Sequence, residues 1–140
     1  MAHDEKLDLL HRIPLFNRFD RKHLERLGML TEEVDVPAGK VLIRQSELGD
    51  DLMIIVSGAV SVERDGTKVN RLGPGEFFGE IAVIDRGPRT ATVTSETPCR
   101  LLVVNHRDFH ALMDEFPDVA AQVLATLAHR LRSLDPNALH

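Results

Sequence analysis

The chain has 140 residues, with a hydrophobic fraction of 43%, a charged fraction of 28% and a formal net charge of −5 at pH 7. This composition is typical of one soluble globular domain, and the negative charge argues against direct binding to nucleic acid, whose phosphates require a basic surface. Its one cysteine, Cys99, excludes an internal disulfide, and we expect a cytoplasmic protein because the sequence shows neither a membrane-spanning apolar run nor a secretory signal.

The N-terminal part carries the pattern of two short helices. Apolar residues recur at helical spacing over residues 4–12, and Pro14 ends that segment within the apolar corner Ile13-Pro14-Leu15-Phe16. Asp20 is placed to cap a second helix over residues 21–29. We expect these helices to bury an apolar face that consists of Leu7, Leu10, Leu24 and Leu27 and that can include Leu9 and Met29.

From Glu33 onward, apolar and polar residues alternate with the period of two that is typical of strands. Turn signals separate the strands, among them a polar loop at residues 46–50 and the hairpin signal Asp65-Gly66. Many short strands broken by turns indicate a sandwich or a roll rather than a parallel sheet. The strands are expected at residues 33–36, 40–44, 52–57, 59–64, 67–72, 90–97 and 99–104.

The segment 73–95 is the most informative part of the chain. A Gly-Pro-Gly turn and two phenylalanines lead to Gly79 and Glu80, and a short helix is expected over residues 81–84. The N–H groups at a helix start attract anions, and Gly79 allows the backbone to approach a ligand closely. Arg89 offers the planar fork of donors that suits a phosphate. Glu80 would repel a phosphate, but it can accept hydrogen bonds from sugar hydroxyls.

The C-terminal part is helical again. Asn105 can cap one helix, and Pro117 fits the first turn of another, which the residues from Asp135 onward end. The last helix carries an apolar stripe, which is compatible with core packing, with a lid over a ligand or with a dimer contact. The stripe comprises Ala120, Val123, Leu124, Leu127, Leu131 and Leu134.

Two segments, Phe78-Gly79-Glu80-Ile81-Ala82-Val83 and Arg89-Thr90-Ala91-Thr92-Val93, are separated by a five-residue spacer. Together they resemble the phosphate-binding cassette of cyclic nucleotide-binding domains. The resemblance implies that Glu80 binds the ribose 2′-hydroxyl and that Arg89 pairs with the cyclic phosphate, assisted by backbone N–H groups near Ala82 and Thr90. The plain alternative is a surface turn with an Arg–Glu ion pair. The ligand-binding residues implied are Phe78, Gly79, Glu80, Ile81, Ala82, Arg89, Thr90 and Ala91.

The same resemblance implies the fold. The class is α+β and mainly β: an eight-stranded antiparallel β-roll, a form of jelly roll, with N-terminal helices and C-terminal lid helices. We expect one domain, with a helical segment at 1–30, a roll at 31–104 that includes the cassette 73–95, and helices at 105–135. Ser46 stands in a loop where the family often has glycine, which leaves the geometry of that turn open.

The function implied is a sensor of a 3′,5′-cyclic nucleotide, with cAMP favoured over cGMP. Thr90 bears on that choice, because in the family a threonine at this place can contact the exocyclic amine of guanine. The C-terminal helix covers the base in the family. The residues of this chain that are placed to do so are Leu127, Arg130, Leu131 and Leu134.

Other functions find less support in the sequence. His106 and His110 lie four residues apart without an evident third ligand, so neither a metal nor another cofactor is expected. No serine or threonine has the partners of a nucleophile, so we expect no enzyme. The alternative to a sensor is a ligand-free roll that acts as an interaction or dimerisation scaffold. We expect ligand binding to be transmitted to an effector protein or domain, or to a second copy of this chain that pairs through the C-terminal helix.

Overall fold

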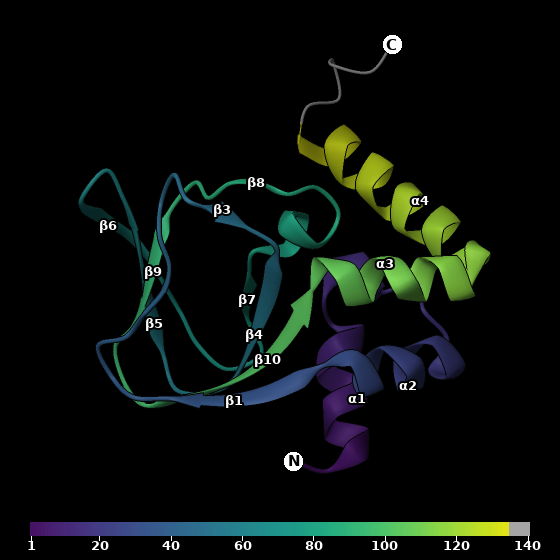
Figure 1. Ribbon diagram of the computed structural model, residues 1–140, viewed down its shortest axis with the longest axis horizontal. Helices are drawn as coiled ribbons and strands as arrows, with labels where there is room; N and C mark the ends of the chain where they lie inside the picture. Colours follow the sequence, from purple (N-terminus) through teal and green to yellow (C-terminus); the bar gives the residue numbers. More distant parts are fainter. Residues whose placement is uncertain (135–140) are drawn as a thin grey trace. The chain divides into compact units, whose positions relative to one another are not determined.

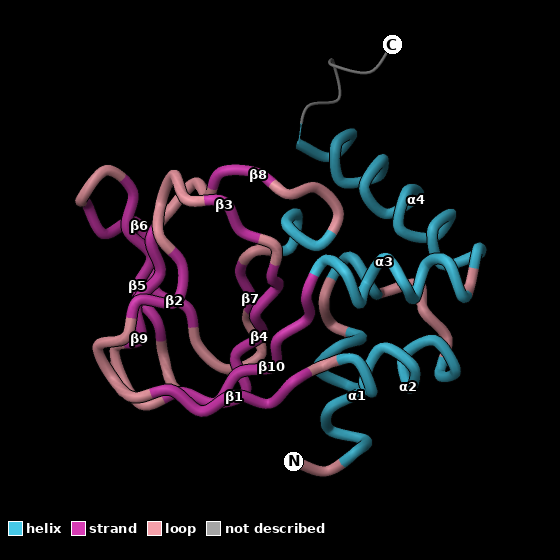
Figure 2. The backbone as a smooth tube through the Cα atoms, in the orientation of Figure 1, coloured by secondary structure: helices cyan, strands magenta, loops and turns pink. Residues whose placement is uncertain are grey.

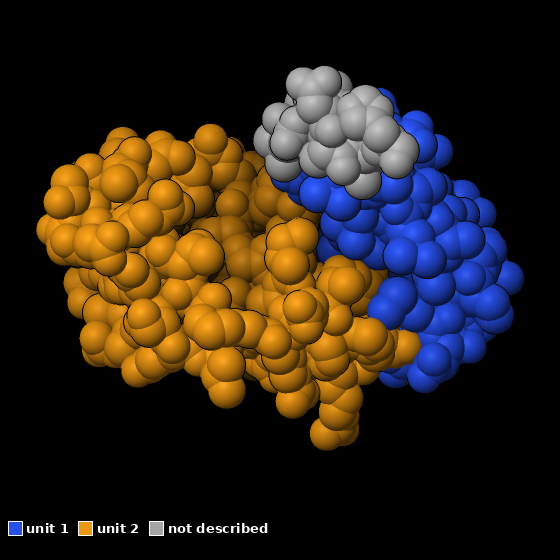
Figure 3. Space-filling model, turned by 90° about the horizontal axis from the view of Figure 1, so that it is seen from above, with its two compact units in different colours: residues 1–29, 111–140 blue, residues 30–110 orange. Residues whose placement is uncertain are grey.

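The computed structural model describes residues 1–134, with side chains described through Arg132. The chain forms two compact units, which Figure 3 shows in different colours. The helical unit is made from the two ends of the chain, residues 1–29 and those from Ala111 onward, and the β unit comprises Leu30–His110. In the part of the chain that the structure describes, no helix is long and apolar enough to cross a membrane.

The N-terminal helices follow the predicted pattern. Asp20 caps α2, because its Oδ1 accepts a hydrogen bond from the backbone N–H of His23 at 3.0 Å. Met29, which the predicted apolar face can include, is 76% exposed, since it lies about 200° around the helix from the buried Leu27. The elements are α1 (His3–His11), the 3-10 helix η1 (Pro14–Phe16) and α2 (Arg21–Leu30), and their other predicted apolar residues Leu7, Leu10 and Leu24 are buried.

The C-terminal helices begin where the sequence predicts. Asn105 caps α3 (His106–Glu115), because its Oδ1 accepts the Asp108 backbone N–H at 2.8 Å. Pro117 is the first residue of α4 (Pro117–Leu134). The buried positions of α4 are Val119, Val123 and Thr126, whereas Leu124 and Leu131 of the predicted stripe are 67% and 56% exposed.

The β unit consists of antiparallel strands in two four-stranded sheets and one two-stranded pair (Figures 1 and 2). The first sheet has the order β1-β10-β4-β7 and the second the order β2-β9-β5-β6, while β3 pairs with β8. The eight strands of the two larger sheets make up the predicted β-roll, so the fold class is confirmed. The bounds are β1 Glu32–Val36, β2 Val41–Ile43, β3 Leu48–Gly49, β4 Asp51–Ser57, β5 Val60–Arg64, β6 Thr67–Leu72, β7 Phe77–Phe78, β8 Gly87–Pro88, β9 Thr92–Ser95 and β10 Cys99–Asn105.

Both larger sheets contribute to one hydrophobic core. Ile55 of β4 and Leu101 of β10 belong to the first sheet, whereas Val60 of β5 and Val93 of β9 belong to the second, and all four are buried in one cluster. Cys99 lies in the same cluster as a buried free thiol. The alternation read from the sequence therefore marks the inward face of both sheets.

Besides the two-residue strands β7 and β8, which the sequence did not predict, two strand predictions differ from the structure. The strand expected at 90–97 is confined to β9, Thr92–Ser95, and the polar loop predicted at 46–50 contains β3. Backbone hydrogen bonds explain both differences. Ser46 N–H donates to the Arg89 carbonyl and Arg89 N–H donates to the Glu47 carbonyl, each at 2.8 Å, so the segment before β9 is held by the β3 loop instead. Ser46 adopts a left-handed conformation with φ of 73° to make this turn.

Candidate functional site

A cavity of about 630 Å³ lies within the β unit. It is bounded by residues of both larger sheets, of the 3-10 turn η2 (Glu80–Val83) and of β8. Its volume is in the range of sites that hold small molecules. All the residues for which the sequence predicts ligand contacts line this one cavity: Phe78, Gly79, Glu80, Ile81, Ala82, Arg89, Thr90 and Ala91.

The cavity also has lining residues that the sequence did not single out. Val62 and Arg64 reach it from β5, and Asn70 and Leu72 reach it from β6. Their spacing of two is the signal in the sequence, because alternate residues of a strand share a face. The alternation alone does not tell which face of a hairpin borders a cavity, so these residues could be found only once the strands were placed.

Gly79 brings the cassette close to β4. Its φ of 82° lies in the left-handed region, and a Cβ at this position would stand 2.5 Å from the Asp51 carbonyl oxygen and 2.6 Å from Arg89 Nη1. The helix predicted at 81–84 is only the single turn η2, in which Ala82 N–H donates to the Gly79 carbonyl at 3.1 Å. A turn this short gives little helix dipole, so the attraction for an anion that we expected from a helix start falls mainly to Arg89.

Glu80 is buried, with 7% of the residue exposed, and it lines the same cavity. Acidic side chains are seldom buried unless they are paired. Glu80 has interactions within the protein. A carboxylate in this position can also accept hydrogen bonds from ligand hydroxyls. Because a hydrogen bond to a charged acceptor is stronger than one to a neutral acceptor, it offsets more of the free energy that a hydroxyl loses when it leaves water.

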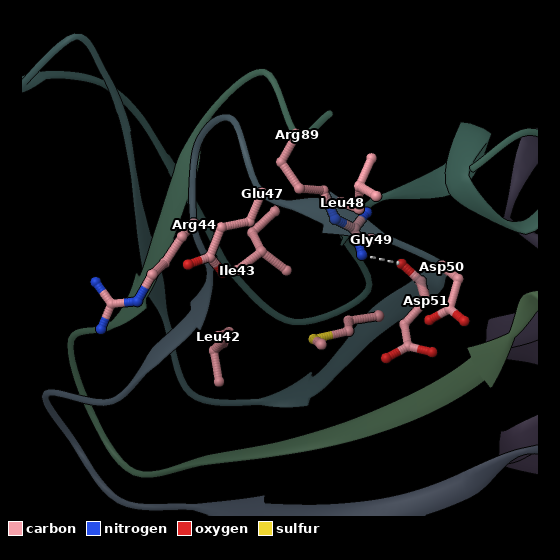
Figure 4. Close-up of a pocket in the computed structure, with 10 residues that line it drawn as sticks. Leu42, Ile43, Arg44, Glu47, Leu48, Gly49, Asp50, Asp51 and Arg89 are labelled. Carbon is pink, nitrogen blue, oxygen red and sulfur yellow. Dashed lines mark hydrogen bonds between the residues drawn. The ribbon is translucent and has the colours of Figure 1, made fainter. Parts of the chain in front are cut away.

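Arg89 lies between two glycines, Gly49 and Gly79. Its Nη2 donates to the backbone carbonyl of Asp51 at 2.9 Å (Figure 4), and its guanidinium occupies the space that a Cβ at Gly49 or at Gly79 would need. Its buried Nε has no hydrogen-bond partner among the described residues. Burial lowers the pKa of Arg89, and the charges of Asp51 and Asp50 oppose that shift. The cation is therefore only partly compensated, and an anion in the cavity would stabilise it.

Two adjacent carboxylates lie near this arginine. Burial and then the neighbouring charge of Asp50 raise the pKa of Asp51, while the charge of Arg89 lowers it. The upward shift shows that the attraction of Arg89 does not offset the cost of burying this carboxylate. Asp50 also lies 3.5 Å from Nη2 of Arg86, an exposed ion pair.

A smaller pocket of about 160 Å³ adjoins this group of charges, and Figure 4 shows the residues that line it. Arg89 and Ile43 line both this pocket and the larger cavity. The remaining walls of the small pocket come from β2, the β3 loop and β4. Arg89 is thus positioned by the β3 loop on one side and is accessible from the larger cavity on the other.

The residues predicted to cover a base lie on α4, in the helical unit. Leu127 and Arg130 are half-buried, Leu131 is exposed, and the side chain of Leu134 lies outside the described residues. Their role stays a prediction. The ring centroids of His106 and His110 lie 4.1 Å apart with the ring planes tilted by 40°, and no group of three or more side chains that could hold a metal ion occurs in the described part of the chain.

Comparison with known proteins identifies a family model and relatives that match this chain. The model of the family described as cyclic nucleotide-binding domain matches residues 33–116. A "CRP-like cAMP-activated global transcriptional regulator" of Mycobacterium tuberculosis is 31% identical over 135 residues, which cover 93% of this chain and 60% of that protein. The chain therefore matches about 60% of the length of this relative.

Two solved structures extend the comparison. The crystal structure of the N-terminal domain of a transcriptional regulator from Streptomyces coelicolor has a TM-score of 0.87 and 34% identity, and the match covers 95% of this chain and 96% of that one. The regulatory domain of Toxoplasma gondii PKA, crystallised with cAMP, has a TM-score of 0.72 and 33% identity, and the match covers 80% of this chain and 46% of that one.

Proposed function

Because the chain belongs to the cyclic nucleotide-binding domain family, we propose that it binds a 3′,5′-cyclic nucleotide in the 630 Å³ cavity and acts as a regulatory module without catalytic activity of its own. The observation that carries this proposal is the convergence of a half-buried arginine and a buried glutamate on one cavity. A ligand with one anionic end and neighbouring hydroxyls matches that pair, and a cyclic nucleotide has both features.

The phosphate would be held by Arg89. Its guanidinium has five N–H donors, and the bond to the Asp51 carbonyl uses only part of them. A buried donor without a partner costs about 1–3 kcal/mol, so phosphate oxygens that satisfy the remaining N–H groups would stabilise the site. Backbone N–H groups near Ala82 and Thr90 would assist, provided that the η2 turn opens its Ala82–Gly79 bond.

The ribose would be held by Glu80, whose carboxylate would accept a hydrogen bond from the 2′-hydroxyl. Phe78, Gly79, Ile81 and Ala91 would enclose the sugar and phosphate from the same cavity wall. Among the bases, adenine is the first candidate. The weak preference read from the sequence agrees with two relatives, a regulator described as cAMP-activated and a PKA regulatory domain crystallised with cAMP.

The signal would pass through the C-terminal helices, with Leu127, Arg130, Leu131 or Leu134 covering the base. Ligand binding can shift the balance between two packings of a helix only if it stabilises one of them more than the other. The regulatory signal would pass to a partner protein, to a further domain or to a second copy of the chain. The same proposal includes a cytoplasmic location for the protein. The alternative is an interaction scaffold, which would need neither Glu80 nor Arg89 for ligand contact.

A melting experiment tests the proposal. Binding raises stability by about 2.7 kcal/mol at a ligand concentration one hundred times the dissociation constant, which corresponds to several degrees for a domain of this size. We expect cAMP to raise the melting temperature by that amount, with a smaller or equal rise for cGMP and none for acyclic 5′-AMP. If neither cyclic nucleotide moves the melting curve at millimolar concentration, the scaffold alternative replaces the sensor.

A further inference from the structure

Arg89 borders two hollows of the β unit at once. It lines the cavity of about 630 Å³, where the proposed function assigns the phosphate, and it also lines the small pocket of about 160 Å³ (Figure 4). Asp50 and Asp51 line the small pocket but not the larger cavity. The same cation therefore serves the ligand on one side and two acidic residues on the other, and the proposed function gives the side chain of Asp51 no role.

The side chain of Asp51 is separate from the hydrogen bond that orients Arg89. That bond runs from Nη2 of Arg89 to the backbone carbonyl oxygen of Asp51, at 2.9 Å. The carboxylate of Asp51 interacts with the guanidinium through its charge. A change of this carboxylate to an amide would therefore remove the charge but keep the carbonyl that orients Arg89.

The surroundings of Asp51 favour its neutral form. Burial and then the charge of Asp50 raise the pKa of Asp51, Glu32 of β1 acts in the same direction, and Arg89 is the cation that lowers it. The residue opposite Asp51 on β10 is the neutral Asn105. Other charged residues lie farther out: Glu47 and Arg44 line the small pocket, Arg86 pairs with Asp50 at 3.5 Å, and Arg107 and Asp108 line a third pocket with Asp50 and Arg86.

We propose that the site binds a cyclic nucleotide together with a proton from solvent on the carboxylate of Asp51, so that acidification strengthens binding. This inference rests on the proposed function and describes the regulation of the same site. The phosphate brings one negative charge to Arg89 and cancels most of the attraction between Arg89 and Asp51. Asp51 is then left with the repulsion of Asp50 and Glu32, which a proton on Asp51 removes.

The sign of the linkage follows from these charges. The pKa of Asp51 is higher in the complex than in the free protein, where it already lies above the ordinary value near pH 4. The affinity is therefore greatest below the pKa of the free protein, falls as the pH rises toward the pKa of the complex, and is constant above it. We expect cAMP to bind about fivefold or more tightly at pH 5 than at pH 8, a difference of about 1 kcal/mol.

Calorimetric titration of cAMP between pH 5 and pH 8 tests the inference. Buffers with different heats of ionisation report how many protons the protein takes up, and the parent should take up protons toward the acidic end of this range. Asp51→Asn should bind without this uptake, with an affinity that does not depend on pH and that exceeds the parent's at pH 8. His110→Gln is the control, because histidine also changes charge in this range and Nε2 of His110 lies 3.4 Å from the Ile84 carbonyl oxygen. This variant should keep the pH profile of the parent.

A second measurement needs no nucleotide. Arg89→Gln removes the charge that a phosphate would cancel, so the carboxyl carbon of Asp51 should titrate at a higher pH in this variant than in the parent, as followed by carbon NMR. An unchanged midpoint would overturn the inference, because it would show that Arg89 does not control the charge of Asp51.

The outcomes separate this inference from the proposed function. Equal cAMP affinity at pH 5 and pH 8, or a pH profile that persists in Asp51→Asn, would overturn the inference and leave the proposed function standing. Weaker binding by Asp51→Asn at pH 8 would also overturn it, since the carboxylate would then support the site rather than oppose the phosphate. If no cyclic nucleotide binds at any pH, the inference and the proposed function are both wrong.

Discussion

Arg89 makes its hydrogen bond to a backbone carbonyl rather than to a carboxylate in the described part of the chain. A carbonyl orients the guanidinium but does not neutralise it, and the burial that lowers the pKa of Arg89 shows that its charge lacks full compensation. A phosphate can therefore approach without breaking an ion pair. The same bond to Asp51 fixes the direction of the guanidinium before it meets a ligand, which reduces the entropy lost on binding.

Removing Arg89 should weaken cyclic nucleotide binding strongly. Loss of one partner of a buried, hydrogen-bonded charge pair costs about 2–5 kcal/mol, or roughly 30-fold to several thousandfold in affinity. We expect Arg89→Ala to lose at least the lower value and Arg89→Lys to recover only part, because lysine lacks the planar fork. Arg86→Ala is the control, since this exposed arginine pairs with Asp50 instead. Titration calorimetry compares the variants, and equal losses for Arg86→Ala and Arg89→Ala would contradict the assignment.

Asp51 should make the stability of the protein depend on pH. Its pKa is raised in the folded state, first by burial and then by Asp50. The stabilisation from its proton is fully present below the unfolded value, near pH 4, and is lost as pH rises through the folded pKa. Asp51→Asn should therefore melt at a higher temperature than the parent at pH 7, and this gain should vanish near pH 3. A constant difference between the two melting temperatures across that range would refute the linkage.

At the scale of elements, the pair of β3 and β8 positions the arginine. Gly49 of β3 lies opposite Gly87 of β8, and only the former faces the guanidinium. A Cβ at Gly49 would overlap Arg89, whereas a Cβ at Gly87 would meet no atom within 4 Å. We expect Gly49→Ala to displace Arg89 and to lower nucleotide affinity by about tenfold or more, a loss above 1.4 kcal/mol. Gly73→Ala should bind like the parent, because a Cβ there would meet no atom within 4 Å and Gly73 does not line the cavity. A similar affinity for Gly49→Ala and Gly73→Ala would show that β3 does not position the arginine.

The β3 loop also contains a turn that glycine would suit better. Ser46 has φ of 73°, a conformation that costs a residue with a Cβ about 1–2 kcal/mol, and part of this is offset by the greater freedom of glycine in the unfolded chain. Ser46→Gly should raise the free energy of unfolding by about 0.5–1 kcal/mol in urea denaturation. Asp65→Gly should gain less, because Asp65, with φ of 54°, accepts a 2.8 Å hydrogen bond from Gln45. A loss of stability in Ser46→Gly would mean that its side chain stabilises this turn.

For the molecule as a whole, the sequence predicts well what depends on local signals. The capping residues Asp20 and Asn105 and the Asp65-Gly66 hairpin act over a few residues, and the structure has each of them at the expected place. The pairing of β3 with β8 joins segments about 40 residues apart through strands of two residues each. Such short strands carry no alternation, so no pattern in the sequence could reveal them.

The candidate site also has parts that the sequence predicts and parts that it does not. The predicted ligand-binding residues are close together in the sequence, and the structure brings all eight of them to one cavity. The contact of Arg89 with the Asp51 carbonyl involves a backbone group, which no residue type can signal. The cavity-lining residues Arg64 and Asn70 could not be recognised for another reason, because polar residues on alternating strand positions usually face solvent.

The most direct measurement is a calorimetric titration of cAMP into the purified protein. The proposal predicts saturable binding with one nucleotide per chain, since one cavity contains both Arg89 and Glu80. It also predicts that 2′-deoxy-cAMP binds more weakly, because Glu80 would lose its hydroxyl partner, and that 5′-AMP does not compete. Absence of heat and of saturation at millimolar cAMP and cGMP, with the protein folded, would contradict the central claim that this cavity is a cyclic nucleotide site.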